Sequence, residues 1–509
     1  MHKKFLFKIM SLMAIVAATT ISVQAFSSVN YTRTSKLASG RWVKIEIPES
    51  GIYQLTFDEL TQMGFSNPEN VRVYGLGGYP INEVLDGSQI DDLQQIPIKV
   101  YDNKICFYGC GTVKFTLSTP TGTPHYIREF NSYSTKGYYF VTEDGNDELL
   151  EIANVNSTAI ANPVARTHSL DYWHHEQDII SPGESGKEML GESMIGGEID
   201  IPYSIPTLCT DSMVVVNIDA GAKVTAASYI YGKLNGNNLN FQNITAKIYA
   251  PANSFVYYNY ASPYVAFVPT NETPMLTDGN INVSIGSESG EVTSAWLDYI
   301  TITYFHNNTL EGSEDNQLRM GFQKLTKQDR ITFAEANTNY QLWNIDDPYN
   351  PTNCVMSAND NGVMGFAPNV TANMGQYIAF NPAMTLKSIS NYTEVANQNI
   401  HGLPDPDMII VTCEELLPQA ERVAQMHRDN DNMVVHVIDQ QKIFNEFSSG
   451  TPDAMGIRLM SKMFYDRNGN KYKHLLMFGA GNYDNRQLHA KRECTILAYE
   501  ATISNDEVG

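Results

Sequence analysis

The spacing of apolar residues changes near His401, and this change constrains the possible folds more than any other feature of the sequence. Beyond that point, short apolar runs alternate with segments of helical spacing, at 408–412, 416–424, 434–438, 453–464 and 474–479. Strands that alternate with helices are joined by right-handed crossovers and form a parallel sheet with helices on both faces. The sequence therefore predicts an α/β domain with three parallel strands in this part of the chain.

The helix before the third of these strands has a recognisable start. Thr451 stands where an N-cap is expected, Pro452 where the first helical residue is expected, and Asp453 where the helix dipole favours a negative charge. Apolar residues then repeat on one face, up to Phe464. We therefore expect the helix to begin at Pro452, with Thr451 as its cap.

The part of the chain before His401 has the pattern of a β protein. Residues 42–47 and 296–304 alternate between apolar and polar side chains, and clusters of glycine and asparagine separate such runs. Many short strands with turns of this kind are typical of β-sandwiches and jelly rolls. The glycine run at 75–78 leads into Tyr79 and Pro80 rather than a helix, so we interpret it as a turn and not as a dinucleotide site.

The first 25 residues have the pattern of a secretory signal peptide. A basic start is followed by an apolar stretch at 9–18 and by small residues at Val23 and Ala25, where a signal peptidase would cleave. The apolar stretch is short for a bilayer, and no later stretch approaches the length of a membrane span. We expect an exported chain with no transmembrane span after the signal peptide.

The charge balance argues against nucleic acid as a partner. The 509 residues include 34 Lys and Arg against 56 Asp and Glu, which gives a formal net charge of −22. Affinity for nucleic acid depends on cationic groups that displace counterions from the phosphates. Hydrophobic residues make up 42% of the chain, enough for packed cores. At about 150 residues per domain, the length predicts roughly three or four domains.

Two residues near the predicted parallel sheet could carry chemistry. Cys413 follows the first strand, at the edge where ligands of such sheets bind. A nucleophilic thiol needs a lowered pKa, whereas the neighbouring Glu414 and Glu415 would raise it. We therefore interpret Cys413 as a bystander, and His401 as a histidine of the linker before the sheet.

Two further strings resemble metal sites only in part. His174-His175-Glu176 lacks the second helical histidine of a zinc peptidase, because Ile179 stands in its place. Asp466–Asn470 has alternating oxygen ligands, but Lys471 stands where a calcium loop has glycine and no bidentate glutamate follows. We predict no metal at either place and interpret 466–470 as a solvated turn.

One string carries a specific family resemblance. Asn445–Ala454, followed by Met463–Arg467, resembles the gingipain family of cysteine peptidases, and is most similar to the members that act as sortases in type IX secretion. Leu475–Arg486 looks like the next strand and loop of the same family. Weaker similarities follow in the family's order along the upstream chain, at 42–55, 73–78, 91–93, 185–192 and 296–299.

The resemblance implies a caspase-like α/β peptidase domain behind β-rich N-terminal modules, with a Cys–His dyad that cleaves secreted cargo. In the family the catalytic His and Cys follow on strands beyond the one that ends at Gly479, and no residue here matches either motif. We therefore assign no catalytic residue and no cofactor, and expect a C-terminally truncated, inactive peptidase. Gly479, Gly481 and Asp484 form the candidate active-site edge, where Ala480 replaces an acidic residue common in the family.

The resemblance also implies partners and a location. Secreted protein substrates and outer-membrane secretion components are the implied partners, at the outer-membrane surface or outside the cell. One alternative stays open: a secreted non-catalytic protein of the cell surface whose β-sandwiches act as a scaffold or bind a glycan or a partner. Exposed aromatic residues clustered on one sandwich face would favour that alternative.

These patterns divide the chain into five parts. We expect a signal peptide, an N-terminal β-rich domain, a β-sandwich domain, a small β-rich domain and a partial gingipain-type α/β domain, at 1–25, 26–155, 156–310, 311–395 and 396–509.

Overall fold

The computed structural model describes most of the chain beyond Asn30. The described residues are 31–119, 123–145, 147–181, 186–187, 189–195, 197–210, 212, 214–224, 229–239, 259–260, 264–268, 278–288, 292–334, 339–359, 362–368, 372–489 and 495–500. The predicted signal peptide and Cys494 lie outside them. In the part of the chain that the structure describes, no helix is long and apolar enough to cross a membrane.

The N-terminal module consists of two sheets that enclose a core. The first has the order β29 (Tyr392–Val395), β1 (Trp42–Ile47), β9 (Gly137–Thr142), β3 (Arg72–Tyr74) and β4 (Gln95–Ile96). The second has the order β28 (Lys387–Ser388), β2 (Gly51–Thr56), β6 (Lys104–Gly109) and β5 (Lys99–Tyr101). Apolar residues of both sheets and of α2 (Phe57–Gln62) bury one another, among them Ile45, Leu55, Leu60 and Phe107. Strands from residues 387–395 thus complete sheets formed by the first 142 residues.

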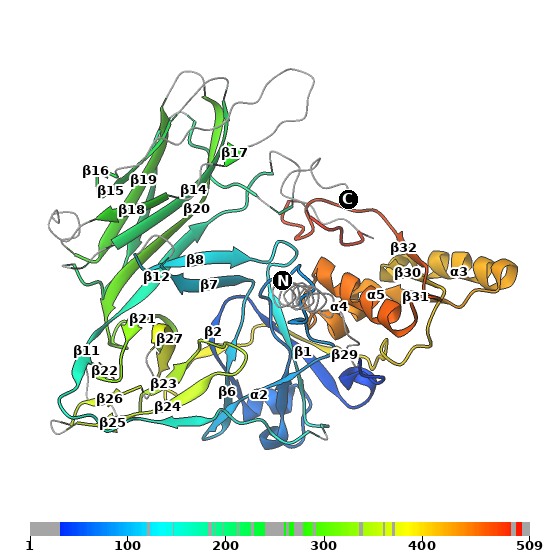
Figure 1. Cartoon of the computed structure of the whole chain (residues 1–509), viewed down its shortest axis with the longest axis horizontal. Coiled ribbons are helices and arrows are strands. Elements are labelled where there is room, and N and C mark those ends of the chain that lie inside the picture. The colour runs from blue at the N-terminus through cyan, green and yellow to red at the C-terminus, as the bar shows by residue number, and fades with distance from the viewer. Residues whose placement is uncertain are drawn as a thin grey trace, which may run out of the picture.

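A ten-stranded sheet runs along the side of the molecule opposite the α/β part (Figure 1). Its order is β10 (Asn154–Asn156), β24 (Thr352–Val355), β23 (Gln341–Asn344), β27 (Ala372–Phe380), β21 (Gln317–Leu325), β12 (His168–Glu176), β20 (Val292–Asn307), β14 (Val214–Val224) and β17 (Asn259–Tyr260), with β18 (Tyr264–Val268) also paired to β14. β12 and β21 are neighbours through the pair Leu170 and Gly321. The sheet therefore runs across the predicted boundary at 310, and the division of the chain into domains stays a prediction.

Smaller sheets cover the long one. A four-stranded sheet has the order β13 (Ile199–Ser204), β19 (Asn280–Glu288), β15 (Tyr229–Leu234) and β16 (Asn237–Asn238). Its apolar side chains share a core with β14 and β20, as Val216, Val283 and Ile302 show, and this makes a β-sandwich. A second small sheet contains β11 (Val164–Arg166), β22 (Asp329–Thr332), β26 (Met364–Phe366) and β25 (Ser357–Ala358), and a hairpin joins β7 (Val113–Ser118) to β8 (His125–Phe130).

The α/β part confirms the predicted parallel sheet and lies at one side of the molecule (Figure 1). β30 (Met408–Thr412) is central, between β31 (Val435–Asp439) and β32 (His474–Phe478), and all three strands are parallel. α3 (Leu417–Asp431) packs on one face through Ala420 and Ala424. α4 (Gln440–Phe447) and α5 (Ala454–Asn468) pack on the other face, so both faces are covered.

Two local predictions in this part are wrong. The N-cap of α5 is Asp453, whose carboxylate accepts a hydrogen bond from the N–H of Met455 at 2.8 Å, and Thr451 lies before the helix. The reason is that the Thr451 hydroxyl donates instead to the carbonyl of Gly77, at 2.9 Å, in the N-terminal module. Residues 466–468, interpreted as a turn, form the last turn of α5, where Asp466 pairs with Lys462.

Candidate functional site

The carboxyl ends of the three parallel strands meet at one edge, where open α/β sheets bind ligands. Thr412 is the register partner of both Asp439 and Phe478, and its hydroxyl donates to the carbonyl of Phe478 at 2.9 Å. Asp439 caps α4, and burial raises its pKa. This edge carries the loop that the sequence singled out.

The candidate residues Gly479, Gly481 and Asp484 form a short loop after β32. Gly479 and Gly481 are exposed, whereas Asp484 is buried and accepts the N–H groups of Leu488 and His489, each at 3.0 Å. The Asp484 carboxylate is thus used to shape the next turn. A proton-transfer role for Asp484 has no support in this geometry, and the assignment of this loop to an active site stays a prediction.

The sequence did not reveal what holds this loop in place. Arg486 pairs with Asp178 of the sandwich at 2.6 Å, and Asn485 donates to Glu500 at 2.6 Å. Glu500 also accepts the N–H of Gly186 at 2.9 Å, and burial raises the pKa of Glu500 to about 7. The loop at the sheet edge is therefore clamped by a segment that lies some 300 residues earlier in the sequence. No local signal could have predicted that contact.

Cys413 lies at the same edge, directly after β30. Its side chain is buried, and it stands just before Glu414 and Glu415, as the sequence indicated. The five cysteines among the described residues are all buried, and no disulfide joins any two of them. Burial raises the pKa of Cys106, Cys110 and Cys354 to about 12, which is opposite to what a nucleophile needs.

His401 lies in the segment between β29 and β30, before the sheet, as the sequence predicted, but it is part of the packed interior. Its side chain is completely buried, with Nδ1 2.5 Å from a carboxylate oxygen of Glu446 on α4 and Nε2 3.2 Å from Asp91 of the N-terminal module. Burial alone would lower the pKa of His401, but the hydrogen bonds to Asp91 and Glu446 outweigh it and raise the pKa to about 9. α4 begins at the carboxyl edge and runs back, so Glu446 and His401 lie away from that edge.

The other candidate histidines have structural partners. On β12, His174 lies between Thr301 and Glu176, 3.1 Å from each, and His175 lies 2.7 Å from Glu192. Among the described residues, no three His, Cys, Asp or Glu side chains are arranged to hold a metal ion.

The string that carries the family resemblance packs against the N-terminal module. The Lys44 amine donates to the carbonyl of Gly450 at 2.6 Å, and the N–H of Leu76 donates to the Ser449 hydroxyl at 3.0 Å. Burial lowers the pKa of Lys44 to about 7. Within the N-terminal module, a Cβ atom at Gly77 would lie 2.4 Å from the carbonyl of Cys110, so a glycine is needed there for the turn to keep this position. The turn predicted at 75–78 is thus a docking surface for the α/β part.

Comparisons with known proteins agree with this architecture. Residues 401–508 match the model of Peptidase family C25. The chain is similar in structure to dimeric latent PorU from Porphyromonas gingivalis, with a TM-score of 0.78 and 25% sequence identity over 90% of this chain and 43% of that one. The chain thus spans less than half the length of that protein.

Other similarities are far weaker. A β-porphyranase of glycoside hydrolase family 86 from Bacteroides plebeius has a TM-score of 0.18 and 11% identity, over 55% of this chain and 37% of that chain. The VP2 subviral particle of infectious bursal disease virus has a TM-score of 0.17 and 8% identity, over 77% and 75%. No curated protein sequence matches the chain. Residues 401–508 thus match Peptidase family C25, and they follow strand-rich modules whose fold is similar to that of PorU.

Proposed function

We propose that this chain is the N-terminal portion of an exported PorU-like cysteine peptidase that processes the C-terminal sorting domains of secreted cargo at the outer-membrane surface. The family match at 401–508 and the structural similarity to PorU support the proposal. In the proposed enzyme, a thiolate attacks the scissile carbonyl, and the acyl-enzyme passes to water or to an amine. In this proposal, the described part of the chain forms the framework that positions the catalytic site.

The observation that carries the proposal is the outer edge of β32. Within the described residues, β32 pairs with β30 on one side, and its other edge has no strand partner. Leu475 and Met477 on this strand are 42% and 39% exposed, although strands of parallel sheets are normally buried. An apolar edge of this kind is a site where a further strand pairs.

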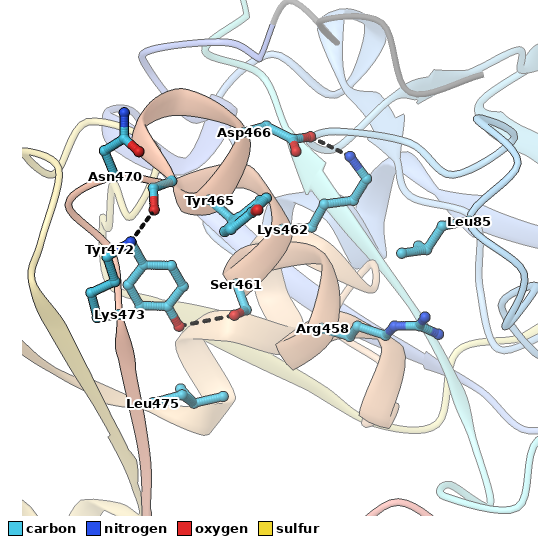
Figure 2. A pocket seen from close by; sticks show the side chains of 11 residues that line it. Leu85, Arg458, Ser461, Lys462, Tyr465, Asp466, Asn470, Tyr472, Lys473 and Leu475 are labelled. Atoms are coloured by element: carbon cyan, nitrogen blue, oxygen red, sulfur yellow. Dashed lines mark hydrogen bonds and ion pairs between the residues drawn. The ribbon is translucent and has the colours of Figure 1, made fainter. Parts of the chain in front are cut away.

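A hollow of about 990 Å³ lies beside that edge (Figure 2). It is lined by the outer side of α5, by the turn after it and by the start of β32, including Tyr465, Tyr472 and Leu475. Tyr465 is 61% exposed, and the Tyr472 hydroxyl is 2.9 Å from that of Ser461. We propose that strands bearing the catalytic His and Cys pair with β32, and that the connecting polypeptide fills this hollow.

The first test asks whether residues 1–509 have activity by themselves. We expect no hydrolysis of fluorogenic peptides or of a cargo sorting domain, and no labelling by a thiol-directed peptide probe, because the proposed dyad is not complete. Turnover that is lost in a Cys413→Ala variant would contradict the proposal.

The second test reads the genomic DNA after the codon for Gly509. We expect an open frame that encodes a strand-borne His-Gly and a later Cys. The product of that longer frame should cleave the cargo, and its Cys→Ala variant should not. A continuing frame with neither residue would exclude the peptidase function and leave the binding or scaffold alternative.

A further inference from the structure

The loop at 479–489 meets the β modules at a junction that is built from charged side chains. Arg486 of the loop pairs with Asp178, which follows β12, at 2.6 Å, and the arginine side chain is 7% exposed. Beside this pair, Arg128 of β8 pairs with Glu176, the last residue of β12, and the Arg128 side chain is 6% exposed. Two ion pairs that are nearly closed to solvent thus join the candidate edge to the sandwich.

A third carboxylate lies at the same junction. Asp298 of β20 is buried, and burial raises its pKa to about 6, against the lowering effect of Arg128 and Arg486. Both guanidinium groups also lie over the ring of Phe130, with the guanidinium carbon of Arg128 4.2 Å and that of Arg486 5.6 Å from the ring centre. Five charged side chains are therefore packed together between β8, β12, β20 and the loop.

The two arginines of this junction lack partners for some of their N–H groups. Nε and one terminal nitrogen of Arg486, and Nε of Arg128, are closed to solvent and have no hydrogen-bond partner among the described residues. A donor that leaves water without gaining an acceptor is costly, and contact with an aromatic ring compensates only for part of that cost. The closed junction therefore carries an energetic cost that is removed when these donors meet water.

A contact whose only role is to stabilise the fold would not need this cost. Apolar side chains of similar volume often stabilise a fold as well as a buried ion pair does, or better. Buried unpaired groups are rare in folded proteins, and one reason for them is strain that is stored at a functional site. The segments that move in a protein are also those of low local stability. The energetics of the junction are thus those of a contact that opens.

We propose that the contact between Arg486 and Asp178 is a latch, which opens within the folded protein and releases the loop at 479–489 from the sandwich. Release gives an extended polypeptide more room at the carboxyl edge of the parallel sheet, from which this loop begins. The opening itself is a property of this chain, whereas the identification of the polypeptide as a substrate rests on the proposed peptidase function.

Native-state hydrogen exchange of the full chain tests the latch without any need for peptidase activity. One reporter is the amide of Gly186, which donates at 2.9 Å to Glu500, a partner of the loop. The amides of Leu488 and His489 report on the loop itself. In the original chain these amides should exchange faster than those of β30, because the latch opens without global unfolding.

Two sets of substitutions at the latch should have opposite effects. Arg486→Met combined with Asp178→Val replaces the ion pair by apolar side chains, and should slow exchange of the reporters about tenfold, because the closed state no longer holds the unpaired donors of Arg486. Asp178→Asn alone should speed it about a hundredfold, since Arg486 then keeps its charge without a counter-charge.

Controls separate the latch from a general loss of structure. Arg41→Met combined with Glu394→Val replaces an exposed ion pair of the N-terminal module and should leave exchange at the junction unchanged. The amides of β30 should remain the slowest in every variant, which shows that the parallel sheet is folded. If the apolar pair does not fold, Arg486→Gln combined with Asp178→Asn takes its place, and should exchange more slowly than Asp178→Asn alone.

Two results would overturn the proposal. In the first, the apolar pair folds and its reporters exchange faster than those of the original chain, as expected for a permanent contact. In the second, the reporters of the original chain exchange as slowly as the amides of β30, so that the junction opens only when the whole chain unfolds.

Discussion

His401 is held between carboxylates that come from distant parts of the chain. Glu446 accepts not only its ring N–H but also the backbone N–H groups of Ile400, at 2.8 Å, and His401, at 3.2 Å. Phe447 stacks on the ring with the centres 4.6 Å apart. Asp92, whose pKa burial raises, lies close by and favours the charged imidazole. A single charged residue thus joins the N-terminal module to α4.

This pair predicts a pH dependence of stability. Folding raises the pKa of His401 from about 6.5 to about 9. The stabilisation is therefore complete below about pH 6.5 and is lost as the pH rises through about 9, with a total of about 3 kcal/mol. We expect His401→Gln to lower the free energy of unfolding at pH 6 and to flatten its decline up to pH 9.5.

Urea unfolding, followed by the circular dichroism signal of helices, would measure this free energy of unfolding. The signal reports on the α/β part, because the longer described helices are α3, α4 and α5. His427→Gln is the matched control, since it removes a histidine that pairs with Asp431 on the surface of α3. Equal pH profiles for the original chain and His401→Gln would show that this pair does not stabilise the fold.

At the scale of elements, the Thr451 hydroxyl and the Asp453 carboxylate before α5 have different roles, although they lie two residues apart. Asp453 caps the helix, and Thr451 contacts the glycine turn of the N-terminal module. Both residues fit an N-cap by type. Only one can cap, and the other side chain is free to join two parts of the chain.

Hydrogen exchange distinguishes these two roles. Asp453→Ala should remove the cap, at a cost of about 1 kcal/mol, and speed exchange of the first-turn amides of α5, from Met455 onward. Thr451→Val keeps the side-chain volume and should leave those amides protected, while the amides near Gly77 exchange faster. Faster exchange of the first turn in Thr451→Val would instead support the cap that the sequence predicted.

At the scale of the whole molecule, contacts between modules fix the position of the candidate edge. Arg486 and Asp178 are both largely buried, so removing one leaves the other without its counter-charge, a loss that costs about 3–5 kcal/mol in buried pairs. We expect Asp178→Asn to speed proteolysis and hydrogen exchange in the loop at 479–489. Glu129→Gln is the control, because its partner Lys114 is exposed. Unchanged protection in Asp178→Asn would mean that the sandwich does not hold the loop.

The sequence by itself determined the elements whose signal is local. The parallel sheet at 408–478 followed from the spacing of apolar residues, since burial on both faces leaves a pattern within each strand and helix. The most specific strings of the family resemblance lay between residues 445 and 486, inside the family match at 401–508.

The tertiary structure decided everything that depends on pairing between distant residues. The apolar pattern of a strand does not identify the strand with which it pairs. The sequence therefore did not predict that β12 lies beside β21, or that residues 387–395 add strands to the N-terminal sheets. The pKa of His401 depends on Asp91, 310 positions away, and the cap of α5 on a carbonyl at Gly77. Buried charges and hydrogen-bond donors need partners wherever the chain can bring them, and only the folded chain shows which partners those are.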